Sequence, residues 1–195
     1  MLEASTIKEH SSDSTRIIRC DDYGNLCASP IENGLPTQFF LTGNGNGTGT
    51  VNLAQDFSAA PFDAYYLATV RYDIYTLAIT ISDNANFNQV DFGAIAGGLT
   101  NGVKFFARVG VTDIPLLSTS LRPIKKNYEW LAITPHTILT TFAGTSQTLT
   151  VDFNVMDEYG KPFTLLPDQR LICRLNDNLS TLVDFTVGVR GIRFV

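Results

Sequence analysis

Three segments decide the fold of this chain: QTLTVDFNVM at 147–156, RLICRLND at 170–177 and TLVDFTVGVRGIRFV at 181–195. Apolar and polar residues alternate in each of them, which is typical of a β-strand with one face in a core. The last segment stays apolar up to Phe194 and Val195, where a frayed end would expose backbone groups and apolar surface together. We therefore expect this strand to be paired inside a sheet and to close the domain.

Further segments with similar alternation predict strands along the rest of the chain. They are 16–20 and 26–28, which would form a small hairpin, and then 37–41, 51–53, 65–81, 103–109 and 136–142. The long run 65–81 has apolar residues on both faces, as a central strand of a sandwich does. A glycine-punctuated stretch at 91–99 leaves room for a short helix, but no segment has a convincing helical period. About eight to ten strands at this spacing predict an all-β fold, a two-sheet antiparallel sandwich of the jelly-roll type.

The N-terminal residues differ from the rest of the chain. Residues 1–15 are polar and serine-rich without periodicity, so we expect an extended arm that becomes ordered only on a partner. Residues 16–195 then form one sandwich domain, because sandwiches of this length are commonly single units. Within it, residues 43–49 contain four glycines and predict a flexible loop or a wide turn. The loop lacks the Gly-Lys-Ser/Thr ending of a phosphate-binding loop, so we interpret it as a spacer or a contact loop.

The charge pattern argues against two classes of partner. The net charge is −5 and the 14 Lys and Arg residues are scattered, whereas nucleic-acid binding needs clustered basic residues. The same balance disfavours an anionic membrane surface. No apolar run reaches the roughly 18 residues of a membrane span, and the first residues lack the apolar core of a signal peptide. We therefore expect synthesis in a cytoplasm and no contact with nucleic acid or membrane.

The three cysteines have two interpretations. Cys20 and Cys27 flank the turn of the expected hairpin, where they would lie across from each other at disulfide distance. In a reducing compartment the favoured interpretation is instead three free thiols, with Cys173 in an alternating strand.

No constellation for catalysis or metal binding stands out. His10 and His136 have no second His or Cys at ligand spacing, which argues against a zinc site. A nucleophilic triad would have to centre on His136, whose neighbours look like the start of a strand. Carboxylates near expected turns are interpreted as acceptors for backbone N–H groups, with a glycosidase pair or a calcium site as the alternative. They are Asp21, Asp22, Asp152, Asp157, Glu158, Asp168, Asp177 and Asp184. We expect no enzyme activity, no cofactor and no metal.

The aromatic content, 13 Phe, 7 Tyr and one Trp, exceeds what a core needs to fill. Several rings fall in expected loops, namely Phe57, Phe62, Phe87, Phe92, Tyr128, Trp130, Tyr159 and Phe163. Three interpretations of these rings are open. They pack beneath long loops, they form a protein interface, or the segment 128–130 stacks on a sugar. For an interface, the candidate partner-binding residues are Ile7, His10, Arg16, Phe57, Phe62, Phe87, Tyr128, Trp130 and Tyr159.

Two stretches resemble known virion proteins. RIIRCDDYGNL at 16–26, a short strand with an Asp-x-x-Gly-Asn-Leu turn after a polar arm, resembles the start of many bacteriophage virion proteins. LPDQRLICRLND at 166–177, followed by a final strand with VRG at 189–191, resembles the closing half of jelly-roll head-decoration and collar proteins. The likeness covers roughly residues 16–28 and 147–195 and supplies no functional residues to carry over.

The resemblance implies a non-enzymatic structural protein of a tailed phage particle, located in the virion after synthesis in the host cytoplasm. The first expectation is a capsid decoration or cement protein that binds the major capsid protein. It would be a homo-oligomer, with a trimer favoured, and residues 1–15 would reach across neighbouring subunits. The second expectation is a collar, tail or fibre-attachment component that contacts portal or tail proteins. The third is a carbohydrate-binding or host-receptor-binding module that uses loop aromatics.

Overall fold

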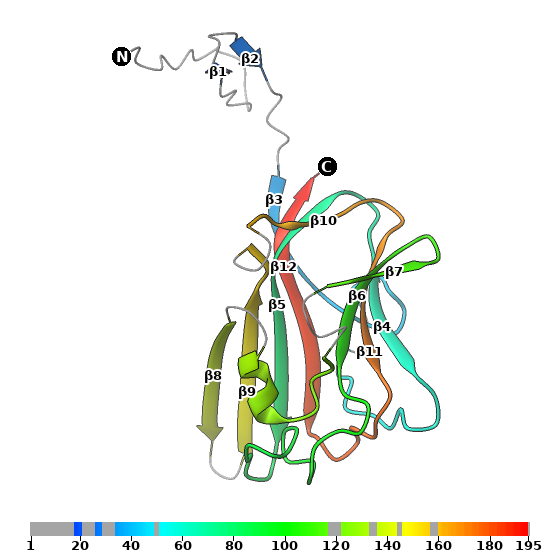
Figure 1. Cartoon of the computed structure of the whole chain (residues 1–195), viewed down its shortest axis with the longest axis vertical. Helices are drawn as coiled ribbons and strands as arrows, with labels where there is room; N and C mark the ends of the chain where they lie inside the picture. Colours follow the sequence, from blue (N-terminus) through cyan, green and yellow to red (C-terminus); the bar gives the residue numbers. More distant parts are fainter. Residues whose placement is uncertain are drawn as a thin grey trace.

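The computed structural model describes most of the chain as two antiparallel sheets packed face to face (Figure 1). The described residues are 18–20, 26–28, 34–48, 51–116, 122–132, 136–143, 146–156 and 160–194. Residues 1–15, the expected arm, lie outside them. The sandwich confirms the predicted fold class.

The larger sheet has the strand order β3-β12-β5-β9-β8. These strands are β3 (Gly34–Phe40), β12 (Asp184–Phe194), β5 (Tyr72–Asp83), β9 (Ser146–Asn154) and β8 (His136–Ala143). A short strand, β10 (Phe163–Leu165), pairs with β5 beyond the end of β9. The final strand therefore lies inside the sheet, between β3 and β5, as the sequence predicts.

The smaller sheet has the order β4-β11-β6-β7. Its strands are β4 (Phe62–Leu67), β11 (Arg170–Leu175), β6 (Lys104–Val109) and β7 (Thr112–Pro115). A separate hairpin consists of β1 (Ile18–Cys20) and β2 (Leu26–Ala28), and a 3-10 helix, η2 (Asn127–Ala132), precedes β8.

The chain crosses between the sheets in the manner of a jelly roll. It passes from β3 to β4, back to β5, across to β6 and β7, back to β9, across to β11 and finally back to β12. Eight strands with this alternation make two four-stranded sheets. β8 is an additional strand at the outer edge, beyond β9 (Figure 1).

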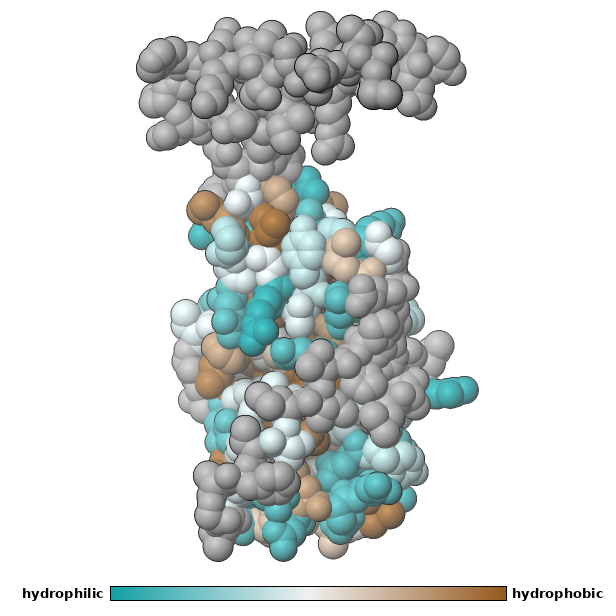
Figure 2. Space-filling model, turned by 90° about the vertical axis from the view of Figure 1, so that its left-hand side faces the viewer, coloured by the Kyte–Doolittle hydropathy of each residue, from teal (hydrophilic) through white to brown (hydrophobic). Residues whose placement is uncertain are grey.

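The core lies between the two sheets and is made by alternate residues of the strands. β5 contributes Ile79 and Ile81, β12 contributes Phe185 and Val187, and the smaller sheet contributes Cys173 among others, all fully buried. Burial raises the pKa of the Cys173 thiol, because the charged thiolate is poorly solvated there. Seen from the side on which β8 lies, the surface mixes hydrophilic and hydrophobic residues (Figure 2). The described part of the chain has no helix with the length and hydropathy to cross a bilayer.

Two expectations about strands are wrong. The run 65–81 is not one strand, because β4 ends at Leu67, β5 begins at Tyr72, and the two lie in different sheets. The crossing at 68–71 contains neither Gly nor Pro and is held from outside, since Ala68 donates to the carbonyl of Gln169 at 2.9 Å. Residues 51–53 form no strand, although Leu53 donates to the carbonyl of Phe185 at 2.7 Å.

The loop and hairpin predictions are met in part. Residues 91–99 contain no helix and turn through glycines with positive φ, such as Gly97 at 78°. β1 and β2 pair as the expected hairpin. The register sets Cys27 opposite Arg19 and Cys20 opposite Leu26, so the two cysteines are not directly across from each other.

Gly191→Ala tests the fit between β12 and β5, whose register shifts between Arg190 and Gly191. A Cβ at Gly191 would lie 2.3 Å from the carbonyl oxygen of Asp73, so the strands would have to separate. At Gly188, on the same strand, the nearest atom would be 3.6 Å away. We expect Gly191→Ala to lower the free energy of unfolding by about 1–3 kcal/mol, and Gly188→Ala to change it by less than about 1 kcal/mol. Urea denaturation measures both, and equal effects would contradict the close approach.

Candidate interaction surface

The outer face of the smaller sheet is made by the residues that alternate with the core positions. Three rows run across the strands in register. They are Tyr65–Ile172–Phe106–Pro115, Leu67–Arg170–Arg108–Asp113 and Asp63–Arg174–Lys104. An apolar row is thus flanked by two rows that carry charges. We call these residues the outer face.

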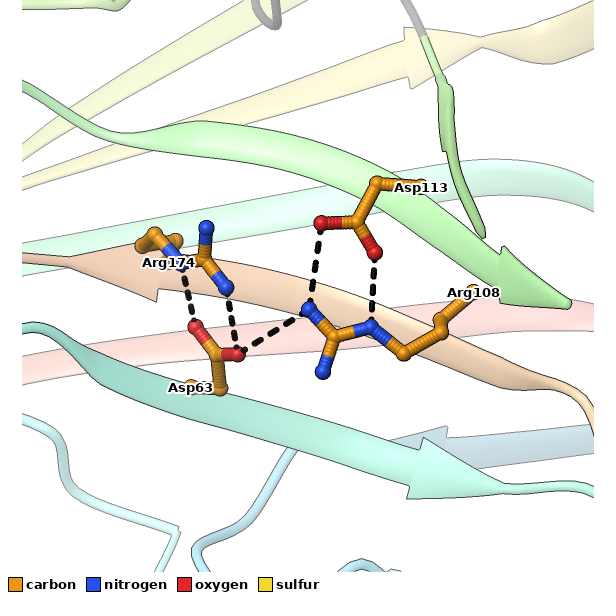
Figure 3. Close-up of polar contacts among 4 residues, drawn as sticks. All are labelled: Asp63, Arg108, Asp113 and Arg174. Carbon is orange, nitrogen blue, oxygen red and sulfur yellow. Dashed lines mark hydrogen bonds and ion pairs between the residues drawn. The ribbon is translucent and has the colours of Figure 1, made fainter. Parts of the chain in front are cut away.

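An ion-pair network links all four strands of this face (Figure 3). Asp63 on β4 accepts from Nε and Nη2 of Arg174 on β11, at 2.6 and 2.8 Å. Asp113 on β7 accepts from Nε and Nη2 of Arg108 on β6, at 2.6 and 3.1 Å. The two pairs are joined because Nη2 of Arg108 lies 3.7 Å from Asp63. Two-point contacts of this kind fix the orientation of each guanidinium.

Apolar side chains lie beneath the guanidinium groups. Phe106 is 5% and Ile172 only 1% exposed, although both belong to the outer face rather than to the core cluster. The guanidinium carbons of Arg174 and Arg108 lie 4.7 and 5.6 Å from the ring centroid of Phe106. Arg170 lies 5.1 Å from the ring centroid of Tyr65. Each guanidinium therefore shields an apolar surface and gains a cation–π contact from it.

The outer face is cationic on an acidic protein. Its cations Lys104, Arg108, Arg170 and Arg174 outnumber its carboxylates Asp63 and Asp113, whereas the whole chain has a net charge of −5. Hydrogen bonds with Asp113 raise the pKa of Arg108, and the same bonds lower the pKa of Asp113. The hydrogen bond to Asp63 raises the pKa of Arg174. Within the described ranges, no carboxylate pairs with Lys104 or Arg170.

The expected partner-binding aromatics lie elsewhere and are mostly packed inward. Phe57 is buried and stacks on Phe62 with ring centroids 4.5 Å apart, and Phe62 and Phe87 pack against the core. Trp130 is fully buried, with ring centroids 5.7 Å from Phe92 and 5.9 Å from Phe153. It therefore offers no open face for a sugar. Tyr128 differs from these residues in being 45% exposed.

The remaining predicted contact residues are Ile7, His10, Arg16 and Tyr159, which lie outside the described residues. The packing interpretation thus holds for most of the aromatic set that the structure describes. Sequence reasoning missed the outer face, because each of its ion pairs joins different strands. The polar positions of RLICRL at 170–175 indicate an exposed strand face. They do not indicate which residues pair with its arginines.

The described part of the glycine-rich loop, residues 43–48, is a wide turn held against β4. Thr42 and Tyr65 exchange two backbone hydrogen bonds, of 3.1 and 2.9 Å, and Leu67 donates to the carbonyl of Gly45 at 2.7 Å. Gly45 has a φ of 74°, and a Cβ there would lie 1.9 Å from the ring of Tyr65. The loop therefore covers the edge of β4 and supports Tyr65 on the outer face.

For Asp177, the structure confirms the interpretation of this carboxylate as an acceptor for backbone N–H groups. It is 8% exposed and accepts from the backbone N–H groups of Thr100, Asn101 and Gly102, at 2.9, 3.1 and 2.8 Å. Asp152 pairs with Arg190 on the larger sheet, at 3.4 Å. Among the residues that the structure describes, no group of three or more His, Cys, Asp or Glu side chains is placed to hold a metal ion.

Asp113→Asn tests the network through its pH dependence. The folded-state pKa of Asp113 is lowered, so its carboxylate stabilises the fold above the unfolded pKa of about 3.9. That stabilisation is lost as the pH falls through the lower folded-state pKa. At pH 7 we expect the variant to be less stable than the wild type by at most about 1 kcal/mol. The difference should be smaller at pH 3, below the unfolded pKa of about 3.9, as measured by urea denaturation.

Asp168→Asn is the matched control, because Asp168 is exposed and makes no ion pair with a described residue. It should leave the free energy of unfolding nearly unchanged at both pH values. A difference for Asp113→Asn that persists unchanged at low pH would contradict the ion-pair account.

Comparisons with protein-family models, with curated proteins and with solved structures gave no match. The fold and the outer face are therefore the features from which a function can be inferred.

Proposed function

We propose that this protein is a structural component of a bacteriophage particle, and specifically a decoration or cement protein of the capsid lattice. Two features support the proposal. The jelly-roll strand order is one that viral capsid domains use. The sequence also resembles phage virion proteins at 16–26 and jelly-roll decoration and collar proteins at 166–177.

The observation that carries the proposal is the outer face of the smaller sheet. Protein interfaces are enriched in Arg and aromatic residues, and this face combines both. The guanidinium groups of Arg108 and Arg174 are held by ion pairs and by the ring of Phe106. Side chains ordered in advance lose less conformational entropy on binding. The face is thus suited to bind a protein surface without rearrangement.

Charge defines the partner surface. The cations Lys104 and Arg170 favour an acidic patch on the capsid protein, and opposite charges speed association. A lattice presents the same patch many times, so an oligomer of this protein gains stability through multivalency even when each contact is weak. The polar segment 1–15 adds contacts to neighbouring capsid subunits in this proposal.

The double variant Lys104→Glu/Arg170→Glu tests the proposal. Neither side chain takes part in the ion-pair network, so the fold should remain intact. We expect its affinity for capsids assembled without the protein to fall at least about tenfold, which is 1.4 kcal/mol, in a co-sedimentation assay. The wild-type affinity should also fall as salt is added, because exposed charges are screened.

Lys161→Glu is the matched control, because Lys161 is exposed on the segment before β10, away from the outer face. It should bind like the wild type. Absence of wild-type binding to capsids would contradict the decoration role. Binding restricted to one vertex, with few copies per particle, would indicate the collar component instead.

A further inference from the structure

The ends of the two sheets differ in how they are protected. An edge strand exposes unpaired N–H and C=O groups, and proteins usually block such edges with short strands, prolines, charges or covering loops. The larger sheet ends at β3 and β8, and the smaller sheet ends at β4 and β7. Each of these four edges is a potential site for pairing with another chain.

Three of the four edges are blocked. β3 has Pro36 in its interior, which lacks an N–H group. The edge of β4 is covered by the wide turn, through hydrogen bonds of 2.9 and 3.1 Å between Thr42 and Tyr65. β7 has only four residues, ends in Pro115 and carries Asp113.

Among the residues that the structure describes, none of these features protects β8. Its sequence, HTILTTFA at 136–143, contains no Pro, Gly, Lys, Arg, Asp or Glu and is rich in residues that favour strands. It pairs with β9 over its whole length, from His136 opposite Phe153 to Ala143 opposite Ser146. Among the residues that the structure describes, no strand pairs with its other side, and it stands at the margin of the sandwich (Figure 1). Thr140, in its middle, is exposed.

The strand next to β8, β9, also presents no unpaired charge. On β9, Thr148 and Thr150 bond through their hydroxyls to Ser82 and Thr80 of β5, at 3.0 and 3.2 Å. The one carboxylate of β9, Asp152, is paired with Arg190. Two copies of a chain with a net charge of −5 repel each other over most of their surfaces. Along the described residues of β8 and β9, two copies can approach without opposing like charges.

We propose that β8 pairs with β8 of a second copy, antiparallel and about a two-fold axis. Such an interface is self-complementary, because each copy offers the same uncharged strand of the same length. The outward backbone groups of both strands are then satisfied, and the two larger sheets become one continuous sheet. The resulting dimer differs from the trimer that the resemblance implies, and it does not depend on the capsid role.

Thr140→Lys tests the pairing, with Thr112→Lys as the matched control. Both threonines are exposed and lie on edge strands, but Thr112 is on the blocked strand β7. A lysine at 140 would face like charge across the two-fold axis. By size-exclusion chromatography with light scattering, we expect the wild type and Thr112→Lys to have twice the chain mass of 21.4 kDa. The dissociation constant of Thr140→Lys should be at least about tenfold higher.

Hydrogen exchange of the wild type provides a second measurement that needs no variant. Amides of β8 should be protected in the dimer and should lose that protection as dilution dissociates it. A monomeric or trimeric wild type would overturn the proposal, as would a dimer that Thr140→Lys leaves intact. A dimer that is lost when residues 1–15 are deleted would also overturn it, because the N-terminal segment would then pair with the edge of β8.

Discussion

The fold depends on the insertion of β12 between β3 and β5. β12 pairs with β5 from Asp184 opposite Ser82 to Arg193 opposite Tyr72, and with β3 from Gly188 opposite Phe40 to Phe194 opposite Gly34. This strand joins parts of the chain that lie far apart in sequence, and such pairings close large loops and form slowly. Gly191 makes the pairing possible where the register shifts, because only a residue without a Cβ fits against the backbone of Asp73. The larger sheet, and the core packed on it, follow from this one arrangement.

The outer face is a consequence of the same arrangement. β4 leads into β5 and β11 leads into β12, so the larger sheet holds the neighbouring strands of the smaller sheet in place. Only in this register does Arg174 meet Asp63, a residue 111 positions away in the chain. The same register sets Arg108 beside Asp113 and both arginines over Phe106. The outer face, with its ordered guanidinium groups, is thus built by strand order rather than by any local motif.

The strands that could be predicted are those with a local signal in the sequence, the alternation of apolar and polar residues. Alternation at 147–156, 170–177 and 181–195 predicts β9, β11 and β12, because one face of each strand is buried. The break between β4 and β5 leaves no such signal, since the crossing at 68–71 is held by Gln169 and not by turn residues of its own. The outer face could not be predicted from the sequence either, since each of its ion pairs joins residues of different strands. The ring of Trp130 is buried because η2 folds back onto β9, which the sequence near it does not reveal.

Native-state hydrogen exchange of the amides of β5 and β12 tests the central claim, that these two strands are the most stable pair of the molecule. Buried positions such as Ile79 on β5 and Val187 on β12, which face each other in the sheet, are the best probes. The account predicts that both exchange only through global unfolding, with a free energy of exchange equal to the free energy of unfolding from denaturation. Exchange at Val187 with a clearly lower free energy, while Ile79 stays protected, would contradict it.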